Sequence, residues 1–232
     1  MRRRLDAMAA RLQPLLIRVE PLARRWIGTA RWALVLVPAI WMVAQVVLGQ
    51  LGANPIEMLQ RESGEWTLRL LAASLAVTPL MRITRWGWLV RERRFLGLSA
   101  FCYAFGHLSI YVGLDMFFDV GDIVNDVLKH RYVTVGMLAF VLLIPLAITS
   151  TRDWIKRLGG KRWNRLHRLV YVSAVAGCIH YLWAVKKDIE EPLLYSSIFA
   201  ALFVLRFLWR RDTTKPRAGG RGAPHGASAP AA

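Results

Sequence analysis

The sequence predicts an all-α integral membrane protein, a bundle of six transmembrane helices. Long apolar runs alternate with short charged segments along most of its 232 residues. Hydrophobic residues make up 55% of the chain, and the mean hydropathy is +0.33. The formal net charge is nevertheless +17, with the basic residues gathered between the apolar runs. Apolar spans with charged connections are typical of a multi-pass membrane protein.

This composition excludes several other classes. The apolar content is too high for a disordered chain, and two cysteines are too few for a disulfide scaffold. A nucleic-acid-binding surface needs basic residues that converge on one soluble face, whereas apolar runs separate them here. We therefore expect contact with membrane lipid and none with nucleic acid.

The first segment, residues 1–31, holds eight Arg and has apolar residues at helical spacing. We predict a basic cytoplasmic segment that forms an interfacial helix on anionic lipid. A cleavable signal peptide is not expected, because the first charge-free run begins only at Trp32.

Six apolar runs follow within a transmembrane domain at 32–210. They cover residues 32–49, 70–81, 96–114, 133–150, 169–185 and 192–205. Most approach the roughly 20 residues that cross a hydrocarbon core of about 30 Å. The second is short unless it begins near Trp66, and Arg69 would then extend toward the membrane surface. The tail at 211–232 is rich in Gly, Ala and Pro, so we expect it to be disordered in the cytoplasm.

The connecting segments predict the orientation. Residues 82–94 contain five Arg and one Glu, and residues 151–165 contain six basic residues and one Asp. The alternate connections, which include Glu65, Asp122 and Glu190, are mildly acidic. The positive-inside rule therefore places both termini and the basic connections in the cytoplasm.

Three histidines lie on the helices of the expected spans, His167 just before the fifth apolar run, and ionisable residues there are functional candidates. At a rise of about 1.5 Å per residue, His107 in the third span lies about 18 Å from the inner surface, and His180 in the fifth about 22 Å. These two share a level, whereas His167 lies only about 3 Å in. His130 and His225 fall in an outer connection and in the tail, where we expect solvated side chains.

Two imidazoles at one level on neighbouring helices favour axial ligation of a haem iron, here between the third and fifth spans. The chain has no C-x-x-C-H motif, so the haem would be b-type, and six-coordinate iron favours electron transfer. The alternative is that each histidine hydrogen-bonds across helices. Zinc is disfavoured, because Cys102 and Cys178 lack ligand spacing.

His167 lacks an evident partner. A second haem needs a ligand about 14 residues before His107, and that position is Arg93, with Arg94 beside it. Three roles stay open for His167: holding a second haem, orienting a propionate, or lining a site for another redox group.

Other candidates surround these histidines. Tyr103 and Tyr111 share the face of His107 at helical spacing, either to orient ligands and propionates or as packing aromatics. Basic residues at the inner end either set topology or anchor propionates or a flavin phosphate; they include Arg93, Arg94, Arg165 and Arg168.

Four ordered runs resemble the MsrQ family, also called YedZ. They are TPLMRITRW (78–86), RRFLGLSAFCYAFGHLSIYVGLD (93–115), PLAITS (145–150) and WNRLHRLVYVSA (163–174). The resemblance covers about residues 30–210. It implies a cytochrome b of the bacterial inner membrane with a ferric-reductase-like transmembrane domain, associated with FMN. It also implies the haem-binding subunit of a periplasmic methionine sulfoxide reductase system.

The resemblance implies an electron relay rather than the catalytic subunit. Electrons would pass from the quinone pool, or from a cytoplasmic flavin reductase, to the periplasmic molybdopterin reductase MsrP, which repairs oxidised envelope proteins. The family's haem-related histidines match His107, His167 and His180, where related NADPH oxidases carry four. The chain has no Gly-rich nucleotide motif of its own. Two alternatives are a stand-alone transmembrane ferric or cupric reductase and a transporter with histidine proton relays.

Overall fold

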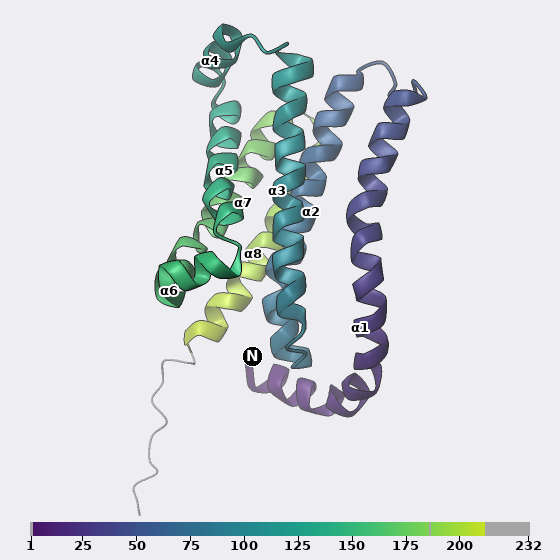
Figure 1. Ribbon diagram of the computed structural model, residues 1–232, viewed down its shortest axis with the longest axis vertical. Helices are drawn as coiled ribbons and strands as arrows, with labels where there is room; N and C mark the ends of the chain where they lie inside the picture. Colours follow the sequence, from purple (N-terminus) through teal and green to yellow (C-terminus); the bar gives the residue numbers. More distant parts are fainter. Residues whose placement is uncertain (1, 186, 212–232) are drawn as a thin grey trace, which may run out of the picture.

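The computed structural model describes residues 2–185 and 187–211, and in this part of the chain every regular element is a helix (Figure 1). The elements are α1 (Arg2–Val47), α2 (Pro55–Thr84), α3 (Leu89–Ile110), the π-helical turn η1 (Tyr111–Asp115), α4 (Val120–Lys129), α5 (Arg131–Ile148), α6 (Arg152–Leu166), α7 (Leu169–Ala184) and α8 (Glu190–Arg211). The expected disordered tail, apart from Arg211, and His225 lie outside the described residues.

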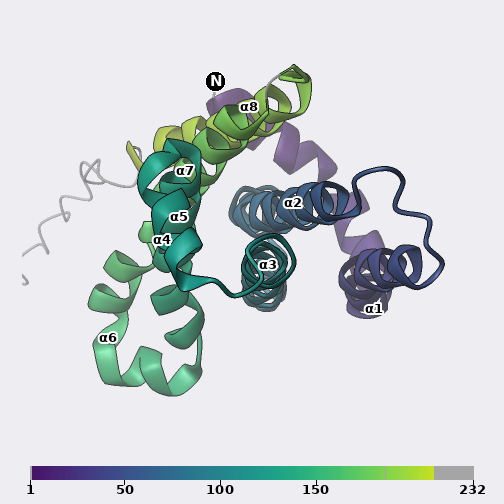
Figure 2. The same cartoon turned by 90° about the horizontal axis from the view of Figure 1, so that it is seen from above.

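Two helix pairs build the centre of the molecule. Helix α3 packs along α2, and α7 packs along α5, while α8 lies against α2 and α7 (Figure 2). The interior centres on α2, where Leu70 and Leu75 are each 1% exposed. Small side chains such as Ala100 on α3 and Ala174 on α7 are fully buried, so neighbouring helices approach closely.

Helix α1 stands at the edge of the bundle. Its first part lies across the lower end and the rest runs beside α2 (Figure 1), and the helix contains Pro14, Pro21 and Pro38. Proline removes a helical hydrogen bond and bends the chain. The upright part turns exposed apolar side chains outward, among them Ile40 at 63%. Such a surface suits lipid.

The connections between the apolar runs are themselves partly helical, which the sequence did not predict. In α4, the Asp119 side chain caps the helix by accepting from the Asp122 amide at 3.0 Å. Helix α6 consists of two helical segments that meet at Gly159, whose φ of 71° and ψ of 148° are non-helical. Only glycine adopts that conformation readily, so the basic inner segment folds into a bent helix.

Among the described residues, four helices are long and apolar enough to cross a membrane: Gln13–Val47, Leu89–Asp115, Arg131–Ile148 and Glu190–Leu208. The apolar helix Leu169–Ala184 is shorter. The structure therefore contains four to five candidate spans. Helix α2, which contains the second expected span, is not among them, and it carries Glu65 and Arg69 within its length.

Candidate functional site

His107 on α3 and His180 on α7 lie together, as their predicted depth requires. Their ring centroids are 6.1 Å apart, and the ring planes are inclined at 82°. The pair lies toward the end of the bundle where α2 and α5 begin and α7 ends. Figure 1 shows this end opposite α6 and the start of α1. It is the end that the charge pattern assigns to the outside.

Each ring is hydrogen-bonded through its Nδ1 atom to a backbone carbonyl oxygen of a neighbouring helix. The Nδ1 of His107 lies 2.9 Å from the Gln60 carbonyl oxygen, and the Nδ1 of His180 lies 2.7 Å from the Tyr132 carbonyl oxygen. A carbonyl oxygen only accepts, so each Nδ1 carries the proton and donates it. Each Nε2 is then left with a lone pair.

This arrangement fits a metal held between the two rings. A histidine that ligates a metal usually donates its other ring N–H to a carbonyl or carboxylate, as both do here. Two metal–nitrogen bonds of about 2 Å each would set the ring centroids roughly 6 Å apart. In the described part of the chain, no group of three or more His, Cys, Asp or Glu side chains could hold a metal ion. Two neutral imidazoles with free Nε2 atoms are a donor set that fits a haem iron.

His167 lies at the other end of the bundle, between α6 and α7. Its ring stacks on Trp163 with centroids 3.8 Å apart, and its Nε2 lies 3.1 Å from Oγ1 of Thr149. Because that hydroxyl donates to the Pro145 carbonyl, Nε2–H donates to the hydroxyl oxygen. Burial, followed by the positive charge of Arg93, lowers the pKa of His167 to about 4, so the ring is neutral at pH 7.

The positive charge of Arg93 acts on His167, and Arg93 occupies the sequence position at which a fourth histidine is missing. The other three predicted arginines are exposed: Arg94, Arg165 and Arg168. The sequence reasoning missed Arg206 on α8, which donates to the Tyr171 hydroxyl at 2.5 Å and to Thr78 at 2.9 Å. An arginine that directly follows the last apolar run gave no signal for this inward contact.

The two predicted tyrosines do not bond to the histidine pair. Tyr103 is buried, and its hydroxyl donates to the Val35 carbonyl at 2.6 Å, which joins α3 to α1. Tyr111 begins the π-helical turn and donates to Asp126 of α4 at 2.7 Å. In the structure, both side chains connect α3 to other helices.

A network of charged and phenolic groups lies beside the pair. Glu65 on α2 is 4% exposed and accepts from Arg61 at 3.0 Å and from Arg69 at 2.6 Å. Tyr181, next to His180, donates to Glu65 at 2.8 Å. The Arg69 side chain is 37% exposed and reaches back one turn toward the start of α2 to bond with Glu65.

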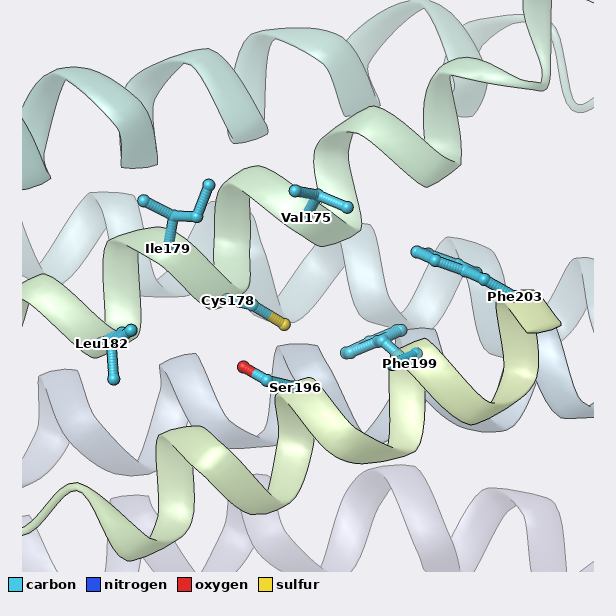
Figure 3. A pocket seen from close by; sticks show the side chains of 8 residues that line it. Val175, Cys178, Ile179, Leu182, Ser196, Phe199 and Phe203 are labelled. Atoms are coloured by element: carbon cyan, nitrogen blue, oxygen red, sulfur yellow. The ribbon is translucent and has the colours of Figure 1, made fainter.

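A cavity of about 240 Å³ lies between α7 and α8, apart from the histidines (Figure 3). Its lining is mostly apolar, with Cys178 and Ser196 as the polar side chains and Phe199 beside them. Neither His107 nor His180 lines it. Both cysteines are free thiols.

Comparison with known proteins agrees with this arrangement. A family model described as "Ferric reductase like transmembrane component" matches residues 63–178. Three relatives carry the name "Protein-methionine-sulfoxide reductase heme-binding subunit MsrQ". The one from Herminiimonas arsenicoxydans is 54% identical over 69% of this chain and 74% of its own length. Those from Rhodospirillum rubrum and Caulobacter vibrioides are 51% and 48% identical over 75% and 79% of this chain, and over 83% and 88% of their own lengths.

No solved structure matches the chain. The resemblance that the sequence motifs predict is confirmed by the relatives, which match over more than two thirds of the chain. The chain belongs to the MsrQ family, the heme-binding membrane subunits of protein-methionine-sulfoxide reductase, and carries a ferric-reductase-like transmembrane domain.

Proposed function

We propose that His107 and His180 would hold a haem b, which would supply the one-electron chemistry by which this subunit passes electrons to MsrP, the catalytic partner. The observation that carries the proposal is the matched pair of Nδ1–carbonyl bonds, which leaves both Nε2 atoms as lone-pair donors. A bound haem supplies a one-electron iron couple. The protein's part is to hold two neutral imidazoles, without an open position for oxygen.

The same proposal includes the topology. Six helices cross the bacterial inner membrane, namely the four candidates named above together with α2 and α7, and both termini lie in the cytoplasm. The basic residues of 82–94 and 151–165 support this orientation. The histidine pair then lies toward the periplasm, where MsrP acts.

Electrons would leave through aromatic rings next to the pair. The Tyr132 ring lies 6.1 Å from His180 and 5.8 Å from His130, measured between centroids. His130 is 53% exposed and its Nδ1 lies 2.6 Å from Asp126. This chain of rings leads from the ligand to the outer surface. We infer that MsrP docks there, against the acidic side chains of Asp119, Asp122 and Asp126.

Two sources of electrons fit the inner end, the quinone pool and a cytoplasmic flavin reductase. The chain lacks a nucleotide motif, so it needs such a donor. His167 and Arg93 lie on that side, and both are candidates to hold a second redox group or its anionic substituent. FMN stays a prediction of the family resemblance, because the names of the relatives mention heme alone.

The test is an optical spectrum of the purified chain with haem quantified per protein. His107→Ala and His180→Ala should each abolish the six-coordinate Soret band and the reduction of MsrP. His130→Ala, outside the pair, should keep the Soret band. A full, unshifted spectrum in His180→Ala would overturn the ligation.

A second function is supported by the family match itself. A ferric-reductase-like domain could deliver electrons to ferric or cupric ions at the outer surface without a partner. The test compares how fast the haem-loaded chain reduces a ferric chelate with how fast it reduces MsrP. Reduction of the chelate at an equal or higher rate would favour a metal reductase over the relay.

A further inference from the structure

Each histidine of the pair lies directly against a glycine of the neighbouring helix. A Cβ atom on Gly136 of α5 would lie 2.5 Å from Nδ1 of His180 and 2.8 Å from its Cε1. A Cβ atom on Gly64 of α2 would lie 3.3 Å from Cε1 of His107 and 3.4 Å from its Nδ1. Non-bonded carbon atoms normally stay about 3.5–4.0 Å apart, so any side chain at position 136 displaces the His180 ring.

The glycine and the carbonyl group form one repeated arrangement. The carbonyl that accepts from His107 belongs to Gln60, one helical turn before Gly64. The carbonyl that accepts from His180 belongs to Tyr132, one turn before Gly136. In both cases the bare helix surface at glycine lets the imidazole approach until its Nδ1–H reaches the backbone.

We propose that Gly64 and Gly136 are positioning residues for the two haem ligands. They set how close each ring lies to its supporting helix, and so where each Nε2 points and how the ring planes are inclined. The inference rests on the proposed ligation by His107 and His180. It adds two residues on the supporting helices, neither of which touches the iron.

The two positions differ in stringency. In Gly136→Ala, the added Cβ atom takes up space that the His180 ring occupies. The ring then loses its hydrogen bond to the Tyr132 carbonyl, and its Nε2 no longer points toward the metal site. Alanine at 64 makes only a tight contact, which a small rotation of the His107 ring relieves. Gly136→Ala should therefore disrupt ligation, and Gly64→Ala should change the inclination of the rings while both ligands stay bound.

Electron paramagnetic resonance separates these outcomes. Imidazole planes close to perpendicular, as the 82° inclination gives, produce a highly anisotropic low-spin ferric signal. In Gly136→Ala, the low-spin signal should be replaced by a high-spin five-coordinate one, or haem should be lost from inserted, folded chain. In Gly64→Ala, the signal should stay low-spin with a changed anisotropy.

Gly106→Ala is the matched control. Gly106 precedes His107 on the same helix, and no atom lies within 4 Å of the Cβ it would gain. The full chain of each variant is purified from membranes, and its spectra are compared with haem content and thermal unfolding. A wild-type spectrum in Gly136→Ala overturns the inference.

If Gly136→Ala does not accumulate in the membrane, Gly64→Ala decides: a changed anisotropy supports the inference and an unchanged one overturns it. His180→Ala separates this inference from the ligation on which it rests. If His180→Ala keeps the wild-type signal, the ligation is wrong. If it loses the signal while both glycine variants keep theirs, only the positioning role is wrong.

Discussion

The proton on Nδ1 decides what His107 and His180 can bind. In each ring Nδ1–H donates to a backbone carbonyl oxygen, so the nitrogen free to bind a metal is Nε2 in both. His167 shows the opposite pattern, since its Nε2–H points to the Thr149 hydroxyl. A group held by His167 would therefore bind through Nδ1, or through Nε2 only after the bond to Thr149 is broken.

The Tyr132 side chain should matter for electron exit but not for haem binding. Its carbonyl orients His180, whereas its ring bridges His180 and His130. Tyr132→Leu keeps the carbonyl and removes the ring. We expect normal haem content and a slower reoxidation of reduced haem by MsrP, measured by stopped-flow spectroscopy. The control is Phe105→Leu, which removes an exposed aromatic ring from a different helix, α3. This variant should reoxidise at the wild-type rate.

Glu65 should matter for stability, because its carboxylate is buried among three donors. Glu65→Ala leaves Arg69 and Tyr181 without that acceptor and should lower the free energy of unfolding by about 2 kcal/mol. Thermal unfolding in detergent measures the change. Glu57→Ala, at an exposed position of the same helix, should cost less than about 0.5 kcal/mol. Equal losses in the two variants would contradict a special role for the buried carboxylate.

The sequence predicted the pairing of His107 with His180, because helical rise converts residue number into depth. It did not predict the groups that hold the rings. Backbone carbonyls carry no residue-type signal, and Gly64 and Gly136 matter only once the facing helix is known. The bond between Arg69 and Tyr195 on α8 was not foreseen for a related reason, since the two residues lie far apart in the chain.

At the level of elements, the break in α6 depends on Gly159. Its φ of 71° with a ψ of 148° is strained for any residue with a Cβ atom. Gly159→Ala should therefore destabilise the inner segment by about 1–3 kcal/mol, with faster hydrogen exchange of the α6 amides. Gly160→Ala, whose added Cβ would meet no atom within 4 Å, is the control and should exchange as the wild type does.

The apolar runs predicted where the long helices lie, and composition explains the rest. Helix α2 extends beyond its apolar run on both sides, since its polar first turns pack against neighbouring helices and need no lipid. Helices α4 and α6 escaped prediction because short amphipathic or basic segments between spans resemble loops in composition. Capping at Asp119 and Thr151 shows what makes them helical.

At the scale of the whole molecule, the charge pattern makes a prediction about sidedness. The test uses two variants, Asp122→Cys on α4 and Arg157→Cys on α6. Each is made in a background from which Cys102 and Cys178 have been removed, so that it carries a single cysteine. In intact cells, a membrane-impermeant maleimide should label the variant at 122 and not the one at 157. Labelling of both after the membrane is permeabilised is the control. The reverse pattern would contradict the proposed orientation.

The two helix pairs carry the same unit. In α2 with α3, and again in α5 with α7, one helix contributes a carbonyl and a glycine one turn later, and its companion contributes the histidine. The histidine follows its glycine by 43 residues in the first unit and by 44 in the second. Little else in the two segments is alike, so the repetition is one of geometry.

That repetition offers a plan for protein design. One unit already contains everything that one side of the metal requires, and both units run in the same direction through the bundle (Figure 1). A two-helix peptide built on α5 and α7 could therefore be made self-complementary, so that a symmetric dimer with its axis along the membrane normal brings two copies of His180 together. Such a dimer would show how little protein is needed to make a membrane cytochrome.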